Sequence, residues 1–104
     1  MKLRYTPEAL SDLAEIKQYI EKDLGSPIAA KNIIRSITVS CRILKEQPRL
    51  GMVLSSLIGR ETDYRYLASG KYIIFYRIEG GSISIYRVIN ARTDYIRNIG
   101  FIGV

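Results

Sequence analysis

The sequence predicts an α+β domain of β-α-α-β-β-β order, in which an N-terminal strand and a helical hairpin pack on an antiparallel sheet. Two observations predict this class. Residues 7–46 contain two segments with apolar residues at helical spacing, and residues 63–94 contain three runs rich in β-branched and aromatic residues. A chain of 104 residues has the size of one domain, so we expect a single domain over residues 1–104.

The first strand and the first helix are predicted at the N-terminus. Lys2–Tyr5 alternates polar with large apolar residues, as a short strand does. Thr6 can cap a helix, and Pro7 suits the first helical position. The apolar positions that follow at helical spacing are Ala9, Leu13, Ile16 and Ile20. Gly25 can take the left-handed conformation that ends a helix, so the first helix is expected over about 7–24.

A second helix is predicted directly after the first. Ser26 and Pro27 repeat the same starting signal, and Pro48 requires the helix to end near Glu46. Its apolar seam is formed by Ala30, Ile34, Ile37, Cys41 and Leu44. Because the link between the helices is short, we expect an antiparallel hairpin whose apolar stripe packs on the sheet. Cys41, the only cysteine, is expected to be a small core residue.

The remaining chain is predicted to form a loop and then the sheet. Residues 47–62 lack clear periodicity, which indicates a connecting loop. Turns are expected at 68–70 and 79–81, between the three strands of a meander. In 71–78 and 82–89, apolar residues occupy both the odd and the even positions, so both faces of these strands carry apolar side chains. We therefore expect helices to cover one face of the sheet and the other face to be at least partly covered. We further expect a helical turn near 95–99 and an apolar C-terminal end that is packed down or covered by a partner.

Composition limits the chemistry that this chain can support. Sixteen Lys and Arg against ten Asp and Glu give a net charge of +6, which favours polyanions or an acidic protein as partners. There is no histidine and only one cysteine, so the commonest general base and the common metal ligands are missing. We therefore expect no cofactor and no metal. The absence of a signal peptide and of a long apolar run predicts a cytoplasmic protein without membrane contact.

Four short motifs together suggest a family. They are Pro48-Arg49-Leu50-Gly51, Tyr64-Arg65-Tyr66-Leu67, the strand Gly70 to Ile78, and Val88 to Tyr95. In this order and spacing they resemble the RelE/ParE superfamily of toxins from type II toxin-antitoxin modules, of the plasmid-stabilisation type, over essentially the whole chain. The resemblance implies a cytoplasmic growth-inhibiting toxin that a cognate antitoxin neutralises. An acidic, partly disordered antitoxin segment would suit the basic surface.

The superfamily contains two activities, and the first is cleavage of ribosome-bound messenger RNA. The resemblance to RelE-like members implies a metal-independent endoribonuclease with Arg65, Arg92 and Tyr95 as the catalytic residues. Basic side chains there would stabilise the charge that develops on the phosphate. Three positions depart from that pattern, because this chain has Ile73 and Thr93 where basic residues are common and Asn90 where related toxins often have His or Tyr.

The second activity is poisoning of DNA gyrase by a protein-protein contact, which ParE-like members perform without a nuclease site. The missing histidine, Ile73 and Thr93 favour this activity. A non-toxic binding domain of the same fold is a third hypothesis. The candidate residues also have structural interpretations. Arg65 and Arg77 can pair with Asp63 or Glu79 at the margin of the sheet, Arg92 can pair with Asp94, Tyr95 can cover the core, and the tyrosines of the strands can pack across them.

Overall fold

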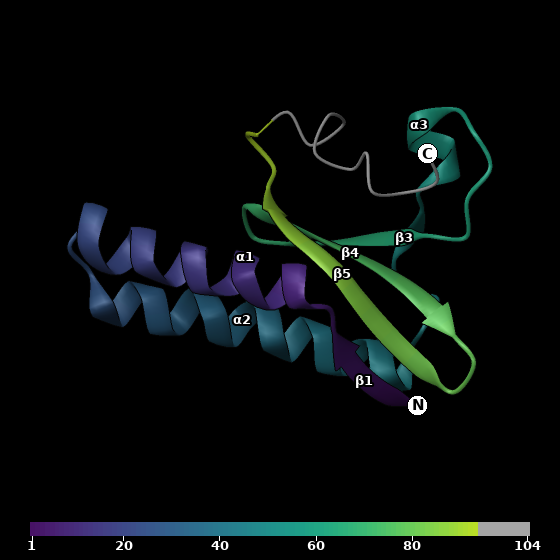
Figure 1. Cartoon of the computed structure of the whole chain (residues 1–104), viewed down its shortest axis with the longest axis horizontal. Helices are drawn as coiled ribbons and strands as arrows, with labels where there is room; N and C mark the ends of the chain where they lie inside the picture. The colour runs from purple at the N-terminus through teal and green to yellow at the C-terminus, as the bar shows by residue number, and fades with distance from the viewer. Residues whose placement is uncertain (94–104) are drawn as a thin grey trace.

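The computed structural model describes residues 1–93. Its elements follow one another as β1 (Lys2–Tyr5), α1 (Pro7–Gln18), a π-helical turn η1 (Tyr19–Asp23), α2 (Pro27–Glu46), β2 (Met52–Val53), α3 (Ser55–Ile58), β3 (Arg65–Ser69), β4 (Tyr72–Glu79) and β5 (Ser82–Asn90). The α+β class and the order of the main elements are confirmed (Figure 1). The helical turn expected near 95–99 and the apolar C-terminal end lie outside the described residues.

The sheet is mixed, with strand order β1-β5-β4-β3-β2. Strands β2 to β5 pair antiparallel, as expected, whereas β1 pairs parallel with β5 through Leu3 opposite Ile83. The antiparallel prediction therefore holds for four of the five strands and not for β1. A parallel pair needs a long connection between its strands, and here the whole chain from α1 to β4 supplies it.

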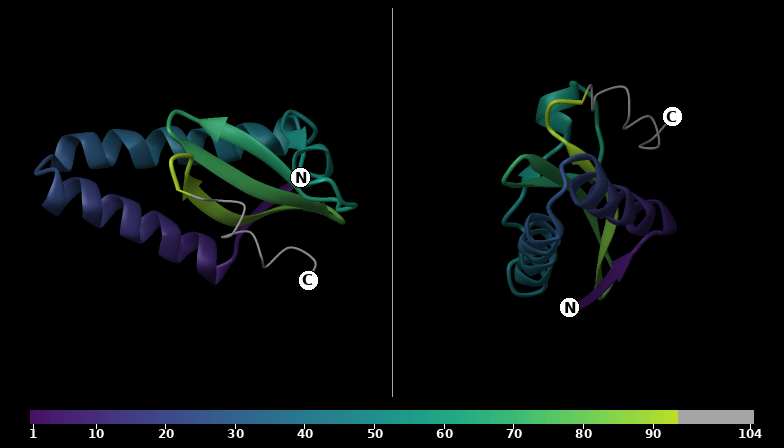
Figure 2. Two further views of the ribbon diagram at one scale, coloured as in Figure 1. Left: turned by 90° about the horizontal axis from the view of Figure 1, so that it is seen from above. Right: turned by 90° about the vertical axis from the view of Figure 1, so that its left-hand side faces the viewer.

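Both helices begin where the sequence predicts. The hydroxyl of Thr6 accepts the backbone N–H of Ala9 at 3.1 Å, and the hydroxyl of Ser26 accepts that of Ala29 at 3.2 Å. Gly25 has φ of +66°, the left-handed conformation expected at the end of the first helix. That helix is regular to Gln18 and then widens into η1, so its last turn is π-helical. Figure 2 shows the far end of the hairpin extending beyond the sheet.

The sheet separates two apolar clusters. The larger one lies under α1 and α2 and includes Ala9, Ile37, Cys41, Leu44, Ile74, Tyr76, Ile83, Ile85 and Val88. The smaller one, on the other face, consists of Leu54, Ile73, Phe75 and Ile89, with Ile58, Tyr64 and Tyr66 packed against it. Both faces of the central strands are therefore covered, which confirms the reading of their two-sided apolar pattern. Cys41 is fully buried, as expected, and burial raises the pKa of its thiol to about 11.

The segment 47–62, which was expected to be a loop, is partly ordered into β2 and α3. Leu54, between these two short elements, is fully buried in the smaller cluster, and its backbone N–H donates to the carbonyl of Tyr64 at 2.9 Å. The prediction of a loop over 47–62 was wrong on this point, because one long-range contact orders a stretch that has no periodicity of its own. Within residues 1–93, no helix is long and apolar enough to cross a membrane.

Candidate functional site

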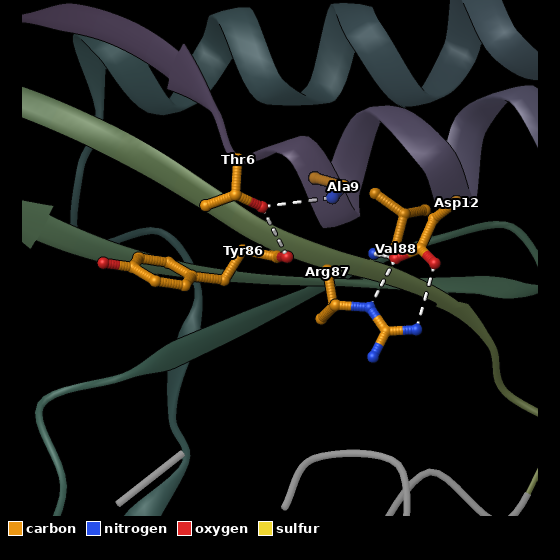
Figure 3. Close-up of polar contacts among 6 residues, drawn as sticks. All are labelled: Thr6, Ala9, Asp12, Tyr86, Arg87 and Val88. Carbon is orange, nitrogen blue, oxygen red and sulfur yellow. Dashed lines mark hydrogen bonds and ion pairs between the residues drawn. The ribbon is translucent and has the colours of Figure 1, made fainter. Parts of the chain in front are cut away.

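On the edge that does not face β4, the second half of β5 is held by the side chains of Thr6 and Asp12 instead of by a strand. β1 ends at Tyr5, opposite Ile85, so β1 does not pair with β5 beyond that residue. The Thr6 hydroxyl donates to the carbonyl of Tyr86 at 2.9 Å, and the Asp12 carboxylate accepts the N–H of Val88 at 2.9 Å (Figure 3). Thr6 thus caps the helix and the strand edge together. This fixes the strand that leads to Arg92.

Asp12 also forms the most buried ion pair of the described chain. Its carboxylate accepts Nε of Arg87 at 2.7 Å and Nη2 at 3.0 Å, a two-point contact that Figure 3 shows directly. The side chains are only 11 % and 27 % exposed. The hydrogen bond that Arg87 donates to Asp12 raises the pKa of Arg87, so its guanidinium stays charged. Arg87 therefore holds α1 against β5 and is directed at that carboxylate.

A second buried polar contact positions Arg65. The Tyr76 hydroxyl donates to the carbonyl of Pro48 at 2.7 Å and accepts the N–H of Gly51 at 2.9 Å. Burial raises the pKa of this phenol, so it stays protonated and can donate. A Cβ at Gly51 would lie 2.6 Å from the Tyr76 oxygen, so this close approach requires glycine. The Arg65 guanidinium then donates to the carbonyls of Gly51 at 2.8 Å and Arg49 at 3.4 Å.

The structure does not bring Arg65 and Arg92 together. Arg65 begins β3 opposite Tyr76 in the middle of β4, whereas Arg92 follows Asn90, which pairs with Tyr72 at the start of β4. From strand spacing, the backbone of Arg65 lies roughly 16 Å from that of Asn90. Tyr95, the third candidate, lies outside the described residues, as does Asp94, the expected partner of Arg92. Asn90 has a local role, because its side-chain oxygen accepts the N–H of Arg92 at 2.9 Å in the turn after β5.

The structural interpretation of Arg77 is confirmed. Its guanidinium contacts the carboxylate of Asp63 at 2.9 Å and that of Glu79 at 3.7 Å. It also lies over the ring of Tyr64, 5.3 Å from the centroid. Arg65 makes different bonds from those expected, to backbone carbonyls and not to Asp63 or Glu79. Tyr64 packs edge to face on Tyr86 with centroids 5.0 Å apart, which is the packing role expected for the strand tyrosines.

Arg92 lines a groove between the far end of the hairpin and the end of the sheet. The groove has a volume of about 580 Å³. Ile20, Ile33 and Ile37 line its helical side, and Lys71 and Arg92 belong to its sheet side together with Tyr72 and Asn90. The groove therefore combines an apolar helical side with two cations, Lys71 and Arg92, on its sheet side.

Sequence reasoning missed Asp12, Tyr76 and this groove. Asp12 reads as a polar residue on the outer side of a helix, and its partners lie 75 and 76 residues away. The segment Pro48 to Gly51 did contain a usable signal. A glycine three residues after a proline can mark a place where another side chain lies close to the backbone. Within residues 1–93, no group of three or more Cys, Asp or Glu side chains could hold a metal ion.

Both the fold and the sequence of this chain are similar to those of known proteins. A solved structure described as a chromosomal ParDE TA system from P. aeruginosa matches with a TM-score of 0.72 and 23 % identity, covering 86 % of this chain and 95 % of that chain. The toxin ParE1 of Caulobacter vibrioides (strain ATCC 19089 / CIP 103742 / CB 15) is 29 % identical over 97 residues, which are 93 % of this chain and 96 % of that protein. Residues 3–95 match the family described as ParE toxin of type II toxin-antitoxin system, parDE. The chain belongs to this family of ParE toxins.

Proposed function

We propose that this ParE-like toxin arrests growth by poisoning DNA gyrase through a protein-protein contact and without catalysis of its own. The observation that carries this proposal is that the Arg65 side chain binds the backbone of its own chain. Its guanidinium donates to the carbonyls of Gly51 and Arg49, at the start of β3, and the residue opposite Arg65 lies four positions along β4 from the one that pairs with Asn90. An endoribonuclease of the RelE type needs cations that converge on the phosphate as its charge increases. The separation of Arg65 and Arg92 supports the gyrase target over messenger RNA cleavage.

Membership of a toxin-antitoxin family implies a cognate antitoxin, and we propose that an acidic, partly disordered segment of it docks in the groove near Arg92. The apolar residues of α2 would receive its apolar side chains, and Lys71 and Arg92 would face its carboxylates. The net charge of +6 supports an acidic partner. Because gyrase acts on the bacterial chromosome, this proposal places the toxin in the cytoplasm.

The experiment that tests the target is induced expression without antitoxin, followed by pulse labelling of DNA and protein synthesis in the same culture. We expect DNA synthesis to fall first, together with induction of the DNA damage response. Rapid loss of translation with messenger RNA cut inside codons would overturn the proposal in favour of the endoribonuclease. In that case Arg92→Ala should abolish cleavage while the fold stays intact.

Two further outcomes test the toxin itself and its antitoxin. Unimpaired growth with confirmed soluble expression would identify a non-toxic binding domain. For the antitoxin, the protein encoded by an adjacent small open reading frame should restore growth when it is co-expressed. We expect this rescue to weaken in a Lys71→Glu and Arg92→Glu double variant, because the margin of the groove would then repel an acidic segment. Full rescue of that variant would exclude the groove as the docking site.

A further inference from the structure

Four cations lie in a row along α2 and have no assigned role in the fold or in the proposed function. The α2 cation row consists of Lys31, Arg35, Arg42 and Lys45. At 100° per residue these positions fall within about 80° of one another, so they share one side of the helix. Lys31, Arg35 and Arg42 are exposed, and Lys45 is half-buried. In the described part of the chain, none of the four charged groups forms an ion pair or donates a hydrogen bond, and the one side-chain contact is the Thr38 hydroxyl donating to the backbone carbonyl of Arg35.

The row forms the basic side of a polarised helical layer. Pro7–Asp23, which covers α1 and η1, contains five Asp and Glu against two Lys. Helix α2 contains the four cations of the row against Glu46 alone. The two antiparallel helices lie side by side in both Figure 1 and Figure 2, so opposite charge excesses meet in one layer. Such an arrangement attracts a polyanion to one side of the hairpin and repels it from the other.

We propose that the α2 cation row binds the phosphate backbone of duplex DNA, independently of base sequence. From Lys31 to Lys45 the row spans roughly 21 Å of straight helix, about the length of six base pairs at 3.4 Å each. Arg and Lys are the residues that contact phosphates most often, and α-helices fit the major groove of B-form DNA. Helix α2 has no aromatic residue, so it offers no stacking platform for the bases of single strands.

The row itself fits a nucleic acid better than an acidic protein. A stable protein interface has an apolar core from which charged residues are depleted, whereas the central position of the row is Thr38, whose hydroxyl donates to the carbonyl of Arg35. The exposed apolar residues of α2, Ile28, Val39 and Ile43, lie on the neighbouring side of the helix. This inference does not depend on gyrase as the target, because DNA binding is measured with the toxin alone.

The test is fluorescence anisotropy of a labelled 20-base-pair duplex titrated with the purified toxin between 50 and 200 mM salt. Four phosphate contacts predict a slope of about −3 to −4 for the logarithm of the binding constant against the logarithm of salt concentration. An Arg35→Gln and Arg42→Gln double variant should bind at least tenfold more weakly at 100 mM salt and should reduce the steepness of that slope by about two. A 20-nucleotide single strand should bind more weakly than the duplex.

The matched control is a Lys2→Gln and Lys22→Gln double variant, which removes the same charge from exposed lysines outside the row. We expect it to retain most of the binding. Equal losses in the two double variants would overturn the proposal, because net charge and not the row would then attract the DNA. Absence of binding at 50 mM salt would overturn it as well. So would unchanged DNA binding by the α2 variant combined with lost binding of the antitoxin, which would assign the row to a protein partner.

Discussion

Arg65, Arg77 and Arg87 of the sheet differ from the four cations of the α2 row in what their charged groups contact. Arg65, Arg77 and Arg87 each contact a carbonyl or a carboxylate within 3 Å. The four cations of the α2 row make no such contact within residues 1–93. Arg65, Arg77 and Arg87 thus hold the structure together, whereas the four cations of the α2 row are available to a partner. Four variants test this contrast, and they follow in order of decreasing expected loss of stability.

Asp12→Ala should be the most damaging of the four. The substitution removes two hydrogen bonds from Arg87 and leaves the buried N–H of Val88 without its acceptor. Breaking a largely buried ion pair in this way costs about 3 kcal/mol of unfolding free energy. Urea denaturation followed by circular dichroism measures the change. Glu15→Ala, one turn further along α1 at an exposed position, is the control and should change stability little. Equal losses in the two variants would contradict the anchoring role of Asp12.

Tyr76→Phe should have the second largest effect. It removes only the hydroxyl, so the ring still fills its place in the core, but the buried N–H of Gly51 loses its acceptor. An unsatisfied buried donor costs about 2 kcal/mol. The same denaturation experiment measures it, with Tyr19→Phe at a half-exposed ring as the control. If both variants unfold at the wild-type denaturant concentration, the contact between Tyr76 and the turn before β2 does not stabilise the fold.

Arg77→Ala tests an exposed pair of the sheet. Asp63 is 62 % exposed and the Arg77 side chain 36 %, so water screens much of the attraction between them. Together with the contact over the Tyr64 ring, the loss should be about 1 kcal/mol, clearly smaller than that of Asp12→Ala. The effect should shrink in 1 M salt because the ion pair is screened. A loss as large as that of Asp12→Ala would show that exposure does not separate the two ion pairs.

The Arg35→Gln and Arg42→Gln double variant should change stability least, by less than about 0.5 kcal/mol. Neither guanidinium forms an ion pair or a hydrogen bond within the described chain, and glutamine is a good helix former. The variant should therefore unfold like the wild type while it loses affinity for duplex DNA. Thermal unfolding in the buffer of the anisotropy experiment checks this directly. A marked loss of stability would place these cations with the structural arginines of the sheet.

The local elements of the fold could be predicted from the sequence, since their signals lie within a few residues of one another. Thr6 and Ser26 cap the two helices, as expected, and Gly25 follows the end of the first helical segment. The parallel pairing of β1 with β5 could not be predicted in the same way, because both edges of the meander are apolar enough to accept a strand. The π-helical turn at 19–23 also has no signal that distinguishes it from a regular last turn.

The contacts of Arg65 and the groove at Arg92 were harder to predict from the sequence than the elements of the fold. The motifs of the family gave the activity class, but they could not tell whether Arg65 faces a substrate or the backbone. That depends on where residues 49 and 51 are held, and Tyr76 holds them from 25 residues away. The groove at Arg92 combines α2, the start of β4 and the turn after β5, three segments that are distant in sequence. Such a surface exists only after the hairpin has packed on the sheet.

The proposal that this toxin acts on DNA gyrase by contact alone can be tested with purified toxin, purified gyrase, ATP and relaxed plasmid. We predict loss of supercoiling and an accumulation of cleaved plasmid that depends on gyrase, with no cutting of plasmid or RNA by the toxin by itself. Unchanged supercoiling at a large excess of toxin, together with cleavage of messenger RNA on purified ribosomes, would contradict gyrase as the target.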